Sequence, residues 1–68
     1  SIQTRFSDFL IKELKQTNVS FNFNTGYGKH TMINIFCENK SETETIKHIL
    51  KTYQIKYFIS EHKGDILC

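Results

Sequence analysis

Two short stretches of alternating residues, separated by a glycine-containing turn, most constrain what this chain can fold into. The first, "VSFNFN" (19–24), alternates strictly, with Val or Phe at every second position. The second, "TMINIFC" (31–37), has Thr31, Ile33, Ile35 and Cys37 on one side and Met32, Asn34 and Phe36 on the other. A period of two is typical of a β-strand with one buried face. The stretch "TGYGK" (25–29) between them predicts a β-hairpin. A phosphate-binding loop is disfavoured, because this turn leads into a strand and not into a helix N-terminus.

The length of the turn determines which residues of the hairpin oppose each other. We expect a three-residue loop, 26–28, with Gly28 in the left-handed conformation. This loop would set three opposed pairs: Phe23 with Thr31, Phe21 with Ile33, and Val19 with Ile35. A four-residue loop would instead expose Ile33 and Ile35, because a register shift of one residue reverses the faces of a strand.

Two helices are predicted, one on each side of the hairpin in the sequence. In 4–17, apolar residues with helical spacing form one face: Phe6, Phe9, Leu10 and Leu14. In 38–53, Ser41 followed by Glu44 fits a capping box. Helical spacing then continues through Ile46, Ile49, Leu50 and Tyr53.

The remaining residues predict a second hairpin. "QIKYFIS" (54–60) alternates, "EHKGD" (61–65) forms a turn with Gly64 in the role of Gly28, and "ILC" (66–68) ends the chain. We therefore predict a single α+β domain over residues 1–68, with the order α-β-β-α-β-β. It would be a two-layer sandwich with two helices on one face of a four-stranded, mainly antiparallel sheet. The shared phase of apolar positions suggests a helix-hairpin pseudo-repeat, 4–37 and 42–68.

This order of elements resembles the core of the LAGLIDADG homing endonucleases, whose open sheet lies on DNA. The resemblance covers most of the chain as topology. The family's defining motif carries a metal-binding acid at the end of the first helix, and "IKELKQTNVSF" (11–21) has neither Gly nor Asp there. Nuclease activity is therefore not implied, and what the resemblance implies is nucleic acid on the open sheet.

Composition narrows the environment and the class of partner. The net charge is only +2, with 9 basic and 7 acidic residues interspersed, whereas a dedicated electrostatic nucleic-acid binder usually carries a basic stripe. The two cysteines predict free thiols in a reducing, cytoplasmic compartment. No apolar run has the length of a membrane span. Nine Ile and no Ala suggest an AT-rich gene, as in a phage or mobile element.

If the helices cover one face of the sheet, the other face stays open. Alternation places on it Ser20, Asn22, Asn24, His30, Met32, Asn34, Phe36, Lys56, Phe58 and Ser60, with Ile66 and Cys68 as further candidates. Contiguous exposed apolar side chains usually mark a contact surface. We therefore predict a partner-binding site formed by Asn22, Asn24, Met32, Asn34, Phe36, Lys56 and Phe58.

Three interpretations of this face remain open. In the first, the chain is a non-catalytic binding or regulatory module, such as an inhibitor, that contacts a protein partner or a second copy of itself. In the second, Phe36 and Phe58 stack on unpaired bases, and three lysines contact phosphates: Lys29, Lys56 and Lys63. In the third, a further segment or the curvature of the sheet covers the face.

Catalytic and metal sites are not predicted. His30, Cys37, His48, His62 and Cys68 lack the close spacing of a zinc site. Cys37 is expected to face the helices as a small buried hydrophobic residue. An acid–base cluster of Lys29 and His30 with Glu61 and His62 would require the two turns to be adjacent. No enzyme and no cofactor are therefore expected.

Overall fold

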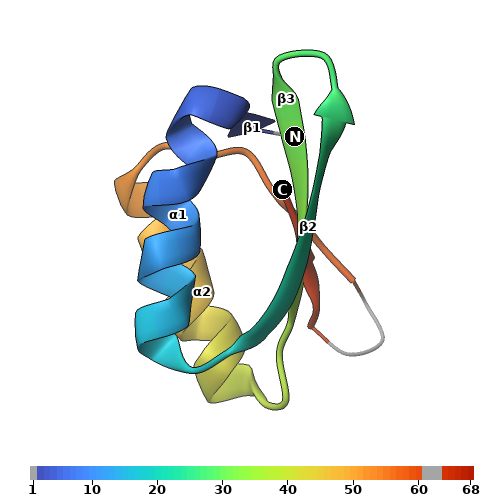
Figure 1. Cartoon of the computed structure of the whole chain (residues 1–68). Helices are drawn as coiled ribbons and strands as arrows, with labels where there is room; N and C mark the ends of the chain where they lie inside the picture. Colours follow the sequence, from blue (N-terminus) through green and yellow to red (C-terminus); the bar gives the residue numbers. More distant parts are fainter. Residues whose placement is uncertain (1, 61–63) are drawn as a thin grey trace.

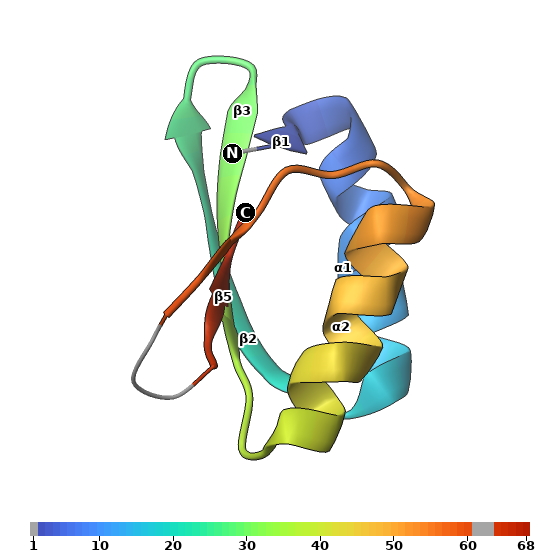
Figure 2. The same cartoon turned by 180° about the vertical axis from the view of Figure 1, so that it is seen from behind.

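The computed structural model describes residues 2–60 and 64–68. Two helices lie side by side on one face of a curled antiparallel sheet, which confirms the α+β class (Figures 1 and 2). The elements are β1 (Ile2–Gln3), α1 (Thr4–Thr17), β2 (Ser20–Tyr27), β3 (His30–Phe36), α2 (Lys40–Thr52), β4 (Phe58–Ile59) and β5 (Ile66–Leu67). Neither helix is long and apolar enough to cross a membrane.

The predicted order of elements is wrong at its start, because β1 precedes α1. This strand has only two residues, too few for a periodic pattern, and it exists because β3 offers an edge to pair with: Ile2 lies opposite Thr31. The order is β-α-β-β-α-β-β, so the order behind the resemblance to the homing endonucleases is not observed.

Strand β3 is the centre of the sheet. On one side it pairs with β2 along its whole length. On the other side it pairs with β1 near its start and with β5 further along, where Asn34 lies opposite Leu67. Strand β4 follows β5 at the rim. The first and last strands of the chain therefore share one edge of β3.

The register of the first hairpin differs from the prediction by two residues. Phe23 lies opposite Ile33, and Phe21 lies opposite Ile35. The expected three-residue loop is replaced by a tighter turn between Tyr27 and His30, with a bulge between Thr25 and Tyr27. Gly28 has the expected left-handed conformation, with φ of 68°. Because a shift of two residues preserves the faces, the predicted inward row of β3 is correct.

Helix α1 has the predicted boundaries but presents a different face to the sheet. Ser7, Leu10 and Leu14 are buried, whereas Phe6 and Phe9 are 52% and 59% exposed. The cause is the close approach of the first turn to the sheet. The Thr4 N–H donates to the Lys29 carbonyl at 2.6 Å, and a small side chain such as Ser7 fits where a ring does not.

Helix α2 begins two residues earlier than the predicted capping box. Asn39 is the N-cap, and its Oδ1 accepts from the Glu42 N–H at 2.9 Å. Glu42 in turn accepts from the Glu38 N–H at 2.9 Å. Asn39 and Glu42 have the same spacing as Ser41 and Glu44, so the sequence contained two overlapping caps, and the helix begins at the first of them as the chain leaves β3.

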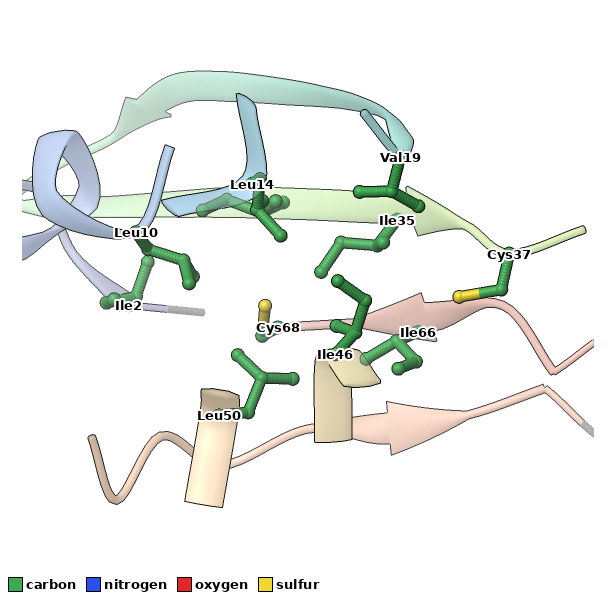
Figure 3. Packing of buried hydrophobic residues seen from close by; sticks show 11 residues of the cluster. Ile2, Leu10, Leu14, Val19, Ile35, Cys37, Ile46, Leu50, Ile66 and Cys68 are labelled. Atoms are coloured by element: carbon green, nitrogen blue, oxygen red, sulfur yellow. The ribbon is translucent and has the colours of Figure 1, made fainter. Parts of the chain in front are cut away.

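The core lies between the helices and the sheet (Figure 3). Leu14 of α1 and Ile46 of α2 point toward Ile35 of β3, and Leu50 of α2 lies on the side of the core where Cys68 lies (Figure 3). Among the described residues, the buried apolar side chains are Ile2, Leu10, Leu14, Val19, Ile33, Ile35, Cys37, Ile46, Leu50, Ile66 and Cys68.

The second hairpin is shorter than predicted. Only Phe58 and Ile59 of the stretch 54–60 form a strand, and Ile59 is exposed although its phase pointed inward. Ile66 and Cys68, named as candidates for the open face, are each 1% exposed in the core. The pairing of Ile66 with Ile35 explains this, since opposed residues share a face. Gly64 has the expected left-handed conformation, with φ of 73°, and residues 61–63 of this turn lie outside the described part of the chain.

Candidate functional site

One face of the sheet is turned away from both helices, and within residues 2–60 and 64–68 no element lies over it (Figures 1 and 2). Cross-strand pairing places four side chains of this face in one row. Asn22 of β2 lies opposite Asn34 of β3, Asn34 lies opposite Leu67 of β5, and Leu67 lies opposite Phe58 of β4. The row runs from polar amides at the β2 side to apolar side chains at the β4 side.

Phe36, Leu67 and Phe58 form what we call the apolar strip. Phe58 is 76% exposed and Phe36 is 43% exposed. All three line one shallow hollow of about 310 Å³. Phe58 is so exposed because β4 is a two-residue strand at the rim of the sheet, without a further strand beside it among the described residues. The structure thus brings the two predicted aromatic residues together and adds Leu67, which the sequence analysis did not select.

The two asparagine side chains of the row form a hydrogen bond with each other. The Asn34 amide donates to Asn22 Oδ1 at 3.0 Å, across the β2–β3 pair. Asn24, two residues after Asn22 on the same face of β2, is exposed. Met32, which lies opposite Asn24 on β3, is half-buried. These four residues therefore lie on the predicted face, next to the apolar strip.

Among the described residues, Asp65 is the charged one that lines the hollow beside the apolar strip. Its carboxylate accepts a hydrogen bond from the Cys37 N–H at 3.0 Å, which joins the end of β3 to the start of β5. The hollow therefore has an acidic border, which disfavours a phosphate group.

The three lysines proposed for phosphate contacts are not brought to the apolar strip. Lys29 lies in the β2–β3 turn and lines a hollow with Gln3 and Arg5. Lys56 is exposed but lines a groove on the helical side of the molecule. Lys63 lies outside the described residues.

The groove that Lys56 lines was not predicted from the sequence. It has a volume of about 570 Å³ and runs between the start of α1 and the segment after α2, lined mainly by apolar side chains. Phe9 packs edge-on against Tyr53, with ring centroids 5.0 Å apart. The Tyr53 hydroxyl donates to Glu13, and this hydrogen bond raises the pKa of Tyr53. The signal in the sequence was an apolar stripe on 4–17 wider than one helix can bury against a sheet.

The two cysteines are free thiols in the core. Burial raises the pKa of Cys37, and it raises the pKa of Cys68 to about 11. Both thiols therefore stay protonated at neutral pH, which is the opposite of an activated nucleophile. Cys37 has the role of a buried apolar side chain, as expected. Glu61 and His62 of the candidate acid–base cluster lie outside the described residues.

Metal ligands do not gather in the part of the chain that the structure describes, where no three His, Cys, Asp or Glu side chains could hold one ion.

Comparisons with protein-family models, curated proteins and solved structures find no match to this chain. The function must therefore be inferred from the geometry of its own surfaces.

Proposed function

We propose that this chain is a non-catalytic binding module that contacts a protein partner through the apolar strip. The observation that carries the proposal is the exposure of Phe58 beside Phe36 and Leu67, around one hollow on the open face. Large aromatic side chains grouped at the surface lose contact with water when a partner covers them, which favours binding. Such a module acts by occupying a surface, and so it would regulate or inhibit its partner.

The neighbours of the apolar strip favour a protein partner over a nucleic acid. Asn22 and Asn34 are joined by a hydrogen bond and carry no charge, so they form a neutral polar border. Asp65 places a negative charge at the hollow, where a phosphate backbone would be repelled. Apolar centres with polar borders are the usual arrangement of protein–protein interfaces.

The test compares capture of partners by three versions of the full chain, in extracts of the organism that produces it. Phe58→Ser should remove the partner, because aromatic side chains at the centre of an interface contribute about 2 kcal/mol or more, which is a factor of about 30 in affinity. Phe9→Ser is the matched control, since Phe9 is also an exposed ring but lies on the helical layer. Phe58→Ser should alter the free energy of unfolding by no more than about 0.5 kcal/mol, because its ring is 76% exposed. Phe9→Ser should lower it by about 0.5–1.5 kcal/mol, because the Phe9 ring packs edge-on against Tyr53.

Equal capture by the wild type and Phe58→Ser would contradict the proposal. Loss with Phe9→Ser alone would assign the partner to the groove beside Tyr53. Titration with single-stranded oligonucleotides at two salt concentrations tests the nucleic-acid alternative, since phosphate contacts weaken as salt rises. Salt-dependent binding that Phe58→Ser abolishes would replace the protein partner with a nucleic acid.

A further inference from the structure

The outer edge of β2 is a long strand edge without a partner in the described chain. Strand β2 has eight residues and pairs only with β3 among the described strands. It runs along one rim of the sheet in both views, whereas the opposite rim is the two-residue β4 (Figures 1 and 2). Alternate residues of an edge strand direct their backbone N–H and C=O groups outward, where they can pair with another strand.

This edge lacks the features that usually prevent such pairing. Natural edge strands carry lysines, prolines or inward-pointing charges, or they are interrupted by bulges. The sequence of β2, "SFNFNTGY", contains no charged residue and no proline. Its bulge lies between Thr25 and Tyr27, so the part from Ser20 to Thr25 is regular and available.

A second observation at the same edge is the exposure of Phe23. Its ring belongs to the face that the helices cover, because Phe23 lies opposite Ile33, which is completely buried. Phe23 is nevertheless 49% exposed. The exposure arises at the side of the sheet, where no described strand continues beyond β2. A strand added to this edge would cover the ring.

We propose that β2 pairs with β2 of a second copy of the chain, antiparallel, about a two-fold axis at Asn22. A two-fold axis perpendicular to the sheet keeps each side chain on its own face, so rings oppose rings and amides oppose polar groups. The opposed pairs are Asn22 with Asn22 of the other copy, Phe21 with Phe23, and Ser20 with Asn24.

The occupant is a second copy because β2 is complementary to itself around this axis. Reading outward from Asn22 in either direction gives a Phe and then a small polar residue, Ser20 on one side and Asn24 on the other. Pairs of aromatic residues across strands stabilise a sheet, whereas like charges directly opposite destabilise it, and no charged pair arises here.

This arrangement leaves the apolar strip free. The two-fold axis places the helices of both copies on one side of a continuous sheet, and it joins the two open faces into one larger face. Phe36 of the apolar strip lies on β3, and Leu67 and Phe58 lie beyond it on β5 and β4. None of the three lies on β2, so each copy keeps its own binding surface. The self-association is therefore independent of the function proposed above.

Sedimentation velocity over a range of concentrations tests the proposal. The wild type should change from monomer to dimer as concentration rises. Asn22→Lys should raise the dissociation constant of the dimer about fivefold, because it places two lysines opposite each other at the axis. Asn24→Lys is the matched control and should have little effect, because this lysine would oppose Ser20. Adding Ser20→Glu to Asn24→Lys should tighten the dimer, since opposite charges then face each other on both sides of the axis.

Cross-linking provides a second readout that does not depend on charge. Residues directly opposite in antiparallel strands have Cα atoms about 4.5–5.5 Å apart, within the range that a disulfide spans. Asn22→Cys should therefore form a covalent dimer on mild oxidation, and Asn24→Cys should form it more slowly. A monomeric wild type at every concentration would overturn the proposal. So would equal cross-linking of the two variants, or a dimer that Phe58→Ser weakens and Asn22→Lys leaves unchanged.

Discussion

Gly64 connects the second hairpin to the helical layer, and its replacement gives a quantitative test of that contact. Gly64 and Gly28 have nearly the same left-handed conformation, with φ of 73° and 68°. An alanine at either position pays the strain of this conformation, about 1 kcal/mol. The surroundings differ, because a Cβ on Gly28 would meet nothing within 4 Å, whereas a Cβ on Gly64 would lie 2.8 Å from Thr43 Oγ1.

The contact with Thr43 determines how much more stability Gly64→Ala loses than Gly28→Ala. Thr43 Oγ1 donates a hydrogen bond to the Gly64 carbonyl at 3.1 Å, and moving its side chain away would break this bond. A hydrogen bond of this kind contributes about 1 kcal/mol. Gly64→Ala should therefore lower the free energy of unfolding by about 2 kcal/mol, and Gly28→Ala by about 1 kcal/mol. For a domain of this size, a loss of 2 kcal/mol corresponds to a decrease in Tm of about 8–16 °C.

Urea unfolding of a double-mutant cycle measures the coupling directly. In a Thr43→Ala background the clash is absent, so Gly64→Ala should cost only about 1 kcal/mol, as Gly28→Ala does. The coupling between positions 43 and 64 is then about 1 kcal/mol. Equal losses from Gly64→Ala and Gly28→Ala in the otherwise wild-type chain would refute the reasoning. They would show that the turn before β5 does not rest on α2.

Three further changes test other parts of the fold by urea unfolding. Leu50→Ala should cost about 3 kcal/mol, because Leu50 is fully buried between α2 and the sheet; a loss below 1 kcal/mol would place it outside the core. Gln54→Gly should stabilise the protein by about 0.5 kcal/mol, because Gln54 directly follows Tyr53, the C-cap of α2, and has φ of 58°, a conformation that glycine adopts more readily; destabilisation would contradict this geometry. Cys68 should make stability fall between about pH 9 and 11, because burial raises its pKa from 9.0 to about 11, so the unfolded chain loses its proton first. The fall should total about 2–3 kcal/mol more in the wild type than in Cys68→Ala, and parallel pH profiles would show that the thiol is not buried in the folded state.

The sequence predicted best what depends on neighbouring residues. Helix α1 has the predicted boundaries, and Thr31, Ile33 and Ile35 face the core as their alternation indicated. Both properties follow from local periodicity, which depends on the geometry of one element. The exposure of Phe36 and Phe58 was also predicted, since alternation assigns each strand residue to one of two faces.

The same periodicity did not determine the register of the hairpin. A shift by two residues leaves every side chain on its original face, so the pattern of apolar residues is equally compatible with both pairings. The bulge before Tyr27 and the tight turn after it select the observed pairing. Local spacing also could not choose between Asn39 and Ser41 as the cap of α2, because each has a glutamate three residues later.

By itself, the sequence determined the class of fold, the extent of the first helix and the side of β2 and β3 that faces inward, because these depend on residues close together in the chain. Only the tertiary structure decided how far each side chain is covered. Ser7 is buried in place of Phe6 because the first turn of α1 lies close to β3, where the Thr4 and Thr31 hydroxyl oxygens are 2.9 Å apart. Leu67 joins Phe58 on the open face because β5 pairs with both β3 and β4. The solvent exposure of a side chain depends on which elements, distant in the sequence, pack beside it, and a local sequence pattern does not predict that packing.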